Sequence, residues 1–269
     1  MEAKAVKREG KKSRGISAFL VIIIALILAE LFFYCVLGAD SNFEGNNPDN
    51  HPHNLLGTMF KGGFVVPIIL TLLLTVVILS VERFFALGKA KGKGNLINFV
   101  YDVKADLKKS NLASAEALCA KQQGSVAAIV DAGLKKYKEM ETVNLAKEQK
   151  IEEIKAEIEE ATALELPSMQ QNLPIIATIS TLGTLMGLFG TVLGMIKSFQ
   201  ALGTGSGVDA TALSVGISEA LVNTATGILT GALAIISYSY FSGKIDNMTY
   251  AIDEMGFALT QTYAETHEK

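Results

Sequence analysis

Glu219 is the residue whose type and position most clearly indicate chemistry in this sequence. It is the only charged residue between Ala210 and Gly243, a stretch of 34 residues. That stretch is long and apolar enough to cross a bilayer, since a span needs ~20 residues. A carboxylate within a span costs about 2.5 kcal/mol or more on insertion scales, so it usually faces a bundle interior and has a function there. No catalytic partner set surrounds it. The sequence therefore predicts a membrane protein that handles an ion and is not an enzyme.

Glu219 also begins a polar stripe along its helix. Asn223, Thr226 and Thr230 follow it at spacings of 4, 3 and 4 residues, so the four side chains lie within about 60° of one another. The alternative is that they only join helices, a role worth ~0.6 kcal/mol each on average. That role explains the threonines, but it explains a carboxylate poorly because a carboxylate is much more costly to bury. Glu219 is expected ~15 Å from the outer end of its span, near mid-membrane.

The preceding apolar stretch carries a matching surface of small residues. Gly183, Gly187, Gly190 and Gly194 are spaced by 4, 3 and 4 residues, which places them on one helix face where another backbone can approach closely. Ordinary close packing explains this pattern, and it is compatible with a channel. On the later helix, a stripe of small residues runs beside the polar one: Gly216, Ala220, Gly227, Gly231 and Ala234.

Other chemical signals are weak. The sequence has no Walker A motif, no Gly-x-Ser-x-Gly and no His-Glu-x-x-His, which disfavours an ATP-driven pump. His51 and His53 form an H-x-H pair without a third ligand nearby, so no metal site is predicted. Cys35 and Cys119 fall on opposite sides of the expected membrane, so no disulfide is predicted. Glu30 is either a helix-packing carboxyl or faces an outer water pocket. We expect no cofactor and no nucleic-acid partner.

The elements that must position Glu219 follow from how the apolar residues are grouped. The sequence is 49% hydrophobic with a mean hydropathy of +0.34, a hydrophobic fraction that a soluble domain can also reach. Soluble core helices, however, do not normally run so long with so few charges. The long apolar runs are Ile16–Leu37, Gly62–Val81, Leu166–Ile196 and Ala210–Gly243. They predict an all-α polytopic membrane protein with about four transmembrane helices and a cytoplasmic helical domain.

The charges between these runs predict the topology. Basic residues cluster before the first run and after the second, whereas the loop between them has only Lys61. The positive-inside rule therefore places both termini in the cytoplasm. The first run is longer than a signal-peptide core and no A-x-A site precedes Asp40, which disfavours cleavage. The expected segments are a basic tail (1–15), an extra transmembrane helix (16–37), a periplasmic loop (38–61), a transmembrane helix (62–87), the cytoplasmic helical domain (88–165), a pore-lining transmembrane helix (166–201), a periplasmic loop (202–211), a second pore-lining transmembrane helix (212–243) and a cytoplasmic C-terminal helix (244–269).

The regions outside the membrane are expected to form a helical bundle. Leu96–Leu107 and Leu112–Tyr137 are predicted helices, and Glu141–Leu166 is a charged helix with one apolar seam. A similar apolar stripe follows the last span, formed by Ile245, Met248, Ile252, Met255 and Leu259. Both stripes favour packing between helices over a binding site.

Two blocks of this sequence resemble a known family. Leu185–Phe199 (LMGLFGTVLGMIKSF) resembles the GLFGTVxGxxxSF block of the MotA/TolQ/ExbB proton-channel family, and Gly216–Gly227 (GISEALVNTATG) resembles its GIxEALxxTAxG block. Met59–Leu74 and Val81–Phe84 (VERF) resemble the family's first span and its cytoplasmic exit. The likeness covers roughly 55–243. Within the family the ExbB branch fits best, with TolQ close behind.

The resemblance implies a function. Subunits of the ExbB type form a pentamer in the bacterial inner membrane, and their last two spans line a central pore. A dimer of ExbD-like single-span proteins sits inside and supplies an aspartate as the main proton carrier, and proton flow energises a TonB-like protein for outer-membrane import. By motif, Glu219 matches the family's pore glutamate, and Thr191 and Thr224 match its pore threonines. The partners implied are copies of this chain, an ExbD-like dimer, a TonB-like protein and the lipid bilayer.

Two departures from the family pattern matter. The usual member has three spans and an outside N-terminus, so the run 16–37 is an added span, expected at the periphery. Thr224 lies five residues after Glu219 and points ~140° away from it, whereas the polar stripe favours Asn223 and Thr226. In a ring, Thr224 can face the pore or an adjacent subunit, so both readings stay open. The rival functions are a TolQ-like or other stator of the family and a non-conducting membrane scaffold.

Overall fold

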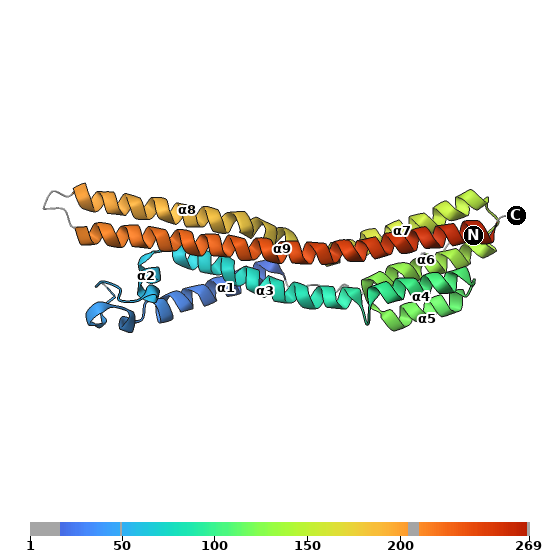
Figure 1. Cartoon of the computed structure of the whole chain (residues 1–269), viewed down its shortest axis with the longest axis horizontal. Helices are drawn as coiled ribbons and strands as arrows, with labels where there is room; N and C mark the ends of the chain where they lie inside the picture. Colours follow the sequence, from blue (N-terminus) through green and yellow to red (C-terminus); the bar gives the residue numbers. More distant parts are fainter. Residues whose placement is uncertain (1–16, 49, 204–209, 268–269) are drawn as a thin grey trace, which may run out of the picture.

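The computed structural model describes residues 17–48, 50–203 and 210–267, and these residues form helices joined by short loops (Figure 1). The prediction of an all-α polytopic membrane protein is confirmed. The described residues contain four helical stretches long and apolar enough to span a membrane and no strand, only an isolated bridge between Phe43 and Pro52. In order, the elements are α1 (Ala18–Phe32) with a π-helical turn (Phe33–Leu37), two 3-10 turns (Asp40–Asn42 and Glu44–Asn46), α2 (Leu55–Lys61), α3 (Val65–Lys91), α4 (Leu96–Lys108), α5 (Leu112–Gln122), α6 (Gly124–Thr142), α7 (Lys147–Gln170), α8 (Leu173–Gly203) and α9 (Ala210–Thr266).

Helix α9 is the axis of the molecule. It runs unbroken for 57 residues, a length of about 85 Å at 1.5 Å per residue. Figure 1 shows α8 lying along one half of α9 and α7 along the other half. The expected cytoplasmic helix 244–269 is thus the direct continuation of the last span.

Helix α1 packs against α3 and makes little other contact. Its small and β-branched residues Val21, Ala25 and Ala29 are buried, and Val21 joins a cluster with Val76 and Leu79 of α3. Its remaining surface exposes large apolar side chains, as expected for a helix that faces lipid or another chain. The added span is therefore attached to one edge of the bundle, through α3.

The helical domain has its own core at the opposite end from α2. It combines α4, α5 and α6 with the adjoining ends of α7 and α9, and residues such as Leu134, Ile154 and Leu259 are buried together. Tyr137 and Tyr263 stack edge to face with ring centroids 4.8 Å apart, and the Tyr263 hydroxyl donates to the Met140 carbonyl at 3.1 Å. The apolar seams predicted for the charged helix and the end of α9 contribute to this core.

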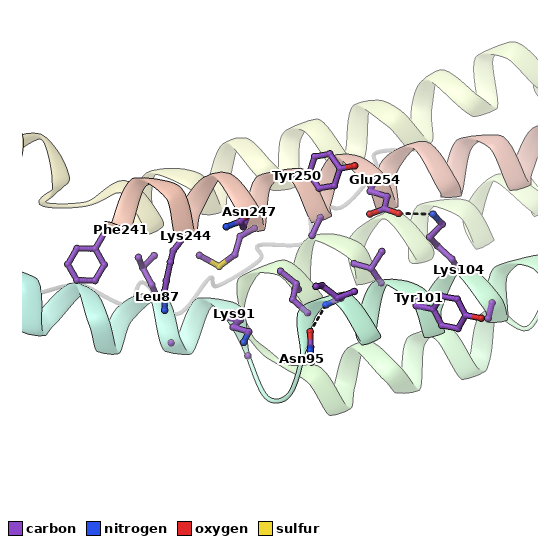
Figure 2. A pocket seen from close by; sticks show the side chains of 18 of the residues that line it. Leu87, Lys91, Asn95, Tyr101, Lys104, Phe241, Lys244, Asn247, Tyr250 and Glu254 are labelled. Atoms are coloured by element: carbon purple, nitrogen blue, oxygen red, sulfur yellow. Dashed lines mark hydrogen bonds and ion pairs between the residues drawn. The ribbon is translucent and has the colours of Figure 1, made fainter. Parts of the chain in front are cut away.

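A groove of about 1190 Å³ lies between α3, α4 and α9, where the apolar part of the rod meets the helical domain (Figure 2). Its lining is mixed, with aromatic rings and lysines from all three helices. Lys104 of α4 and Glu254 of α9 pair across it at 2.7 Å.

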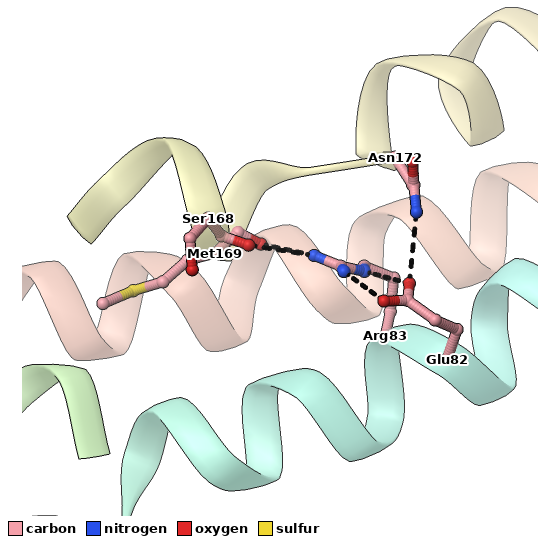
Figure 3. A network of polar contacts seen from close by, with 5 residues as sticks. All are labelled: Glu82, Arg83, Ser168, Met169 and Asn172. Atoms are coloured by element: carbon pink, nitrogen blue, oxygen red, sulfur yellow. Dashed lines mark hydrogen bonds and ion pairs between the residues drawn. The ribbon is translucent and has the colours of Figure 1, made fainter. Parts of the chain in front are cut away.

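A buried polar network marks the break between α7 and α8 (Figure 3). Arg83 of α3 is only 1% exposed and donates Nη1 to the carbonyl oxygens of Ser168 and Met169, at 3.2 Å each. Its Nε donates to Glu82 at 2.6 Å, and Asn172 donates its amide to the same carboxylate at 3.3 Å. Arg83 therefore satisfies carbonyls that the end of α7 leaves without helical donors.

The predicted limits of the charged helix Glu141–Leu166 differ from the structure at both ends. The helix α7 begins at Lys147, because Glu141 and Thr142 belong to the end of α6. The charged helix was expected to pass into the span at Leu166, but α7 continues to Gln170 and the chain turns at Gln171 and Asn172, where Asn172 has φ +65°. Pro174 follows in the first turn of α8, where its missing N–H is tolerated. The turn thus lies between a helix end held by Arg83 and a helix start that accepts proline.

The predicted helix Leu112–Tyr137 is wrong as a single element, because it is divided at Gln123 and Gly124. Both residues have positive φ, 58° and 82°. A Cβ on Gly124 would lie 2.6 Å from the carbonyl oxygens of Lys89 and Ala90, so the end of α3 approaches this turn too closely for any side chain. The break is set by that tertiary contact.

Candidate functional site

The seam between α8 and α9 is built from the small residues of both helices. A Cβ on Gly187 would lie 3.0 Å from the Asn223 carbonyl oxygen and 3.1 Å from the Gly227 Cα. A Cβ on Gly194 would lie 2.8 Å from the Ala220 Cβ, and one on Gly183 would lie 3.1 Å from Thr230 Cγ2. The glycines let the two backbones approach more closely than larger side chains allow. Gly190 has the same position opposite Asn223, with a Cβ distance of 2.6 Å.

Thr191 and Thr224 meet across this seam. Their hydroxyl groups contact each other, and each also donates to the carbonyl oxygen of Gly187, at 3.2 and 3.3 Å. Thr191 lies within 3.3 Å of the Ala220 carbonyl as well. Both side chains are half-buried. Within one chain, Thr224 therefore faces α8, on the side of α9 that the glycines pack against.

Asn223 points into the interior of the chain. It is 2% exposed and donates its amide to the Gly62 carbonyl oxygen at 3.1 Å, which ties α9 to the turn between α2 and α3. Its side-chain oxygen has no hydrogen-bond partner among the described residues. An unpartnered buried amide oxygen is costly and is uncommon in folded proteins. Asn223 thus has one free acceptor beside the seam.

The other members of the polar stripe divide between interior and surface. The Thr226 hydroxyl donates to the carbonyl oxygens of Val222 and Asn223, at 2.9 and 3.0 Å, and its side chain is half-buried. Thr230 is fully buried and donates to the Thr226 carbonyl at 2.9 Å. The polar stripe is continuous along α9, but its side chains are buried at some turns and half-buried at others.

Glu219 is half-buried in a narrow crevice at the level where α3 begins. The crevice is lined by residues of α8, α9 and the turn before α3, including Gly62, Phe64, Lys197 and Asn223. Lys197 reaches this turn, since a Cβ on Gly63 would lie 3.6 Å from its Nζ. Among the described residues that line the crevice, Glu219 is the only carboxylate, and it shares the space with an ammonium and an amide.

Sequence reasoning missed two features of this region. Lys197 of α8 lines the same crevice as Glu219 of α9, which the sequence alone did not indicate. Their proximity depends on the register in which α8 pairs with α9, and no local pattern specifies that register. Counting along α9 alone placed Glu219 near mid-membrane, but its crevice lies beside the first residues of α3. Helices α8 and α9 extend beyond α3 at this end, so their lengths do not give the membrane depth.

The outer surfaces of the α8–α9 hairpin are apolar and exposed. Leu188, Val192 and Phe199 of α8 and Leu221 and Ile228 of α9 all have much of their side chains uncovered. Such a surface suits contact with lipid or with other chains. No group of three or more His, Cys, Asp or Glu that could hold a metal ion occurs in the described part of the chain.

Comparison with known proteins identifies the segment that contains this seam. Residues 121–254, about half of the chain, match the model of the MotA/TolQ/ExbB proton channel family. A putative biopolymer transport protein ExbB-like 3 from Synechocystis sp. is 32% identical over 119 residues, which are 44% of this chain and 57% of that protein. TolQ of the Tol-Pal system from Pseudomonas aeruginosa is 36% identical over 84 residues, 31% of this chain and 36% of that protein.

A longer match has lower identity. TolQ from Haemophilus influenzae is 26% identical over 200 residues, 72% of this chain and 86% of that protein. The matched segment spans less than two thirds of the length of the Synechocystis and Pseudomonas relatives. The family segment includes the α8–α9 seam with Thr191, Glu219 and Thr224. The resemblance predicted from the two sequence blocks is confirmed, and the chain belongs to the MotA/TolQ/ExbB proton channel family.

Proposed function

We propose that this chain is an ExbB-like subunit of an inner-membrane, proton-driven motor that works with an ExbD-like partner to energise TonB-dependent outer-membrane transport. The observation that carries the proposal is the half-buried Glu219 in its crevice, within the segment that also holds the Thr191–Thr224 contact and matches the proton channel family. Relatives named as ExbB proteins, such as one from Pseudomonas putida that is 30% identical over 94 residues, support the ExbB branch.

In this proposal several copies, expected to be five, surround a pore that is lined by α8 and α9. Thr191, Thr224 and Glu219 offer hydrogen bonds to water, and Glu219 can hydrogen-bond the carboxyl group of a single-span partner when one of the two carboxyl groups carries the proton. Moving one charge through the membrane field releases ~2.3 kcal/mol per 100 mV. Because this energy drives the proton, weak contacts along the path are enough to guide the proton. Asn223, with its free acceptor, and Thr226 support the path, and the glycines at 183, 187, 190, 194 and 227 hold the hairpin closed.

Helix α9 transmits movement between the two ends of the chain in this scheme. Because the helix is continuous from the Glu219 crevice into the helical domain, a displacement of the hairpin moves both ends together. The chain itself has no catalytic role in this scheme and needs no cofactor. Proton flow, coupled through the partner, is the source of energy, and α1 sits at the periphery, where its exposed apolar surface faces lipid.

A TolQ-like role is the second candidate within the family. The H. influenzae TolQ match covers more of this chain than the Synechocystis ExbB-like match does, 72% against 44%. The two roles predict the same proton path but a different partner. Co-purification of a TonB-like protein with the complex would favour the ExbB-like role. Co-purification of a Tol–Pal component instead would favour the TolQ-like role.

Proton uptake into liposomes tests the proposal. The complex purified with its single-span partner is compared with the Glu219→Gln variant, and Glu30→Gln on α1 is the matched control, since it removes a carboxylate from another span. We expect uptake to fall about tenfold or more for Glu219→Gln, which corresponds to about 1.4 kcal/mol, and to stay unchanged for Glu30→Gln. Equal uptake by all three complexes would confine Glu219 to a structural role. No uptake by any of them would favour the scaffold.

A further inference from the structure

The groove between α3, α4 and α9 is chemically unlike the α8–α9 seam. Lys91, Lys104, Lys108 and Lys244 line it against a single acidic residue, Glu254, which leaves an excess of three positive charges. Lys104 pairs with Glu254, whereas Lys91 and Lys244 form no ion pair with any residue that the structure describes. Both lysines are exposed. The groove therefore has cations available for an anionic ligand.

The Lys244 end of the groove coincides with the edge of the apolar zone. On α9, Lys244 is the first charge after the apolar stretch, and on α3 the apolar stretch ends at Glu82 and Arg83. The Lys244 ammonium lies 5.9 Å from the Phe84 ring centroid and 4.8 Å from that of Tyr240. Aromatic rings and lysines of this kind gather at membrane–water interfaces. Lys244 is thus placed at headgroup depth, and Lys91 follows on α3 about two helical turns beyond Phe84.

An apolar stripe on α3 leads from the span into the groove. Val77, Val81, Phe84, Gly88 and Lys91 follow one another at spacings of 4, 3, 4 and 3 residues, so they share one face of the helix. All five are exposed. Gly88 lies between the aromatic ring and the lysine, and a Cβ added there would meet nothing within 4 Å. The stripe therefore joins an acyl-chain surface to a cationic pocket through an open gap.

We propose that this groove binds an anionic phospholipid. The phosphate lies between Lys91 and Lys244, the Asn247 amide donates to the headgroup, and an acyl chain follows Val77 and Val81 along α3. Figure 2 shows Lys91, Lys244 and Asn247 arising from the two helices that border this end of the groove. Basic pockets between membrane helices favour such headgroups. An acidic segment of another polypeptide would match the lysines but would leave the apolar stripe inside the membrane unused.

The chain offers a matched pair of variants for the test. Gly88→Leu places a side chain in the groove, and the Cβ of that side chain would meet no atom within 4 Å. Gly243→Leu is the control, since Gly243 lies in α9, has equally open space and does not line the groove. Both changes replace a glycine within a helix and so improve intrinsic helix propensity similarly. A third variant, Lys91→Gln with Lys244→Gln, removes the charges and keeps the groove open.

Native mass spectrometry of the intact complex gives the readout. The complex is mixed with equal amounts of dioleoyl phosphatidylglycerol and dioleoyl phosphatidylcholine, and bound lipid is counted per copy of the chain. We expect the wild type and Gly243→Leu to retain phosphatidylglycerol preferentially. Gly88→Leu should lose most of it, and the double lysine variant should bind about 30-fold more weakly, as expected for two lysines at a membrane surface.

Three results would overturn the proposal. One is equal retention of phosphatidylglycerol by all variants, and another is equal binding of both lipids by the wild type. The third is a change in the number of chains in the Gly88→Leu complex with unchanged lipid per copy, which would make the groove a contact between chains. If Gly88→Leu disrupts the assembly altogether, the double lysine variant is the test. Weaker binding of phosphatidylglycerol by that variant supports the proposal, and unchanged binding overturns it.

Discussion

Thr191 and Thr224 show how hydroxyl groups can serve both packing and function at a helix seam. The two hydroxyl groups contact each other, and each also donates to the Gly187 carbonyl oxygen. Neither hydroxyl therefore needs the other as its hydrogen-bond acceptor. The loss of one hydroxyl therefore leaves the helix pair largely intact. What is lost is a polar group at a position where the remaining surface of α8 and α9 is apolar.

We therefore expect Thr191→Val or Thr224→Val to reduce proton uptake by the reconstituted complex while the yield of folded complex stays near that of the wild type. The stability lost should not exceed about 1.5 kcal/mol, the upper range for one hydrogen bond. Thr178→Val is the control, because Thr178 is exposed on the same helix and its hydroxyl donates only to its own helix, at the Pro174 carbonyl. Equal uptake by all three variants would argue against a role in conduction.

Cys119 provides a pH-dependent prediction outside the membrane. Burial, with Asp131 and Glu116 adding to it, raises the pKa of its thiol from 9.0 to about 12. The folded state therefore holds this proton above pH 9 while the unfolded state loses it, so the thiol's contribution to stability is full below pH 9 and is lost as pH rises towards 12. A water-soluble maleimide at pH 8 should label Cys119 slowly in the folded protein and rapidly after denaturation. Rapid labelling of Cys119 in the folded protein, distinguished by peptide mapping from labelling of the exposed Cys35, would contradict its burial.

At the scale of elements, the close approach of α8 and α9 depends on glycines that cannot be enlarged. A Cβ on Gly227 would lie 2.6 Å from both the Gly183 carbonyl oxygen and the Gly187 Cα, and these are backbone atoms that cannot move aside alone. We expect Gly227→Val to lower stability by about 1–3 kcal/mol or more, as overpacking does, and to reduce the recovered complex in size-exclusion chromatography. Gly243→Val, on the same helix with open space, should have little effect. Similar recovery of both variants would refute the close seam.

The Arg83 network leads to a prediction about the turn between α7 and α8. Arg83→Met removes the charge and leaves Glu82 and two carbonyl groups buried without it, which should cost about 3–5 kcal/mol. Adding Glu82→Gln removes the uncompensated charge, so the double variant should be more stable than Arg83→Met alone. Thermal unfolding of the purified complex measures both. A double variant less stable than the single one would show that the carboxylate has another role.

How much of this could be predicted from the sequence differs between elements. The glycine spacing on α8 and the small residues on α9 predicted the paired faces, because 3.6-residue periodicity is a local signal. The breaks at Gln123 and at Asn172 could not be predicted, since they depend on α3 residues far away in sequence, Ala90 in one case and Arg83 in the other. The proximity of Lys197 to Glu219 and of Asn223 to Gly62 has the same origin.

At the scale of the whole molecule, the chain is a long rod with apolar outer surfaces. Its interior contains polar side chains at only a few levels among the described residues. The polar sites lie at different levels: the Glu219 crevice near the start of α3, the Arg83 network where the apolar part of α3 ends, and the lysine groove along the last turns of α3. Helix α9 passes all three levels. Because one stiff helix links the proposed proton site to the helical domain, the molecule suits the transmission of displacement better than a local switch.

The orientation of this rod in the membrane is a prediction of the charge distribution. Lysine and arginine residues precede α1 and follow the apolar part of α3, and the loop between these helices has only Lys61. Four spans then place both termini on the cytoplasmic side. Alkaline phosphatase, which is active only outside the cytoplasm, should be inactive when fused after Lys269 and active when inserted at Asn50. A green fluorescent protein at the C-terminus should fluoresce. An active C-terminal phosphatase would show the opposite orientation of the rod. The Glu219 crevice would then lie at the cytoplasmic end and the lysine groove in the outer leaflet.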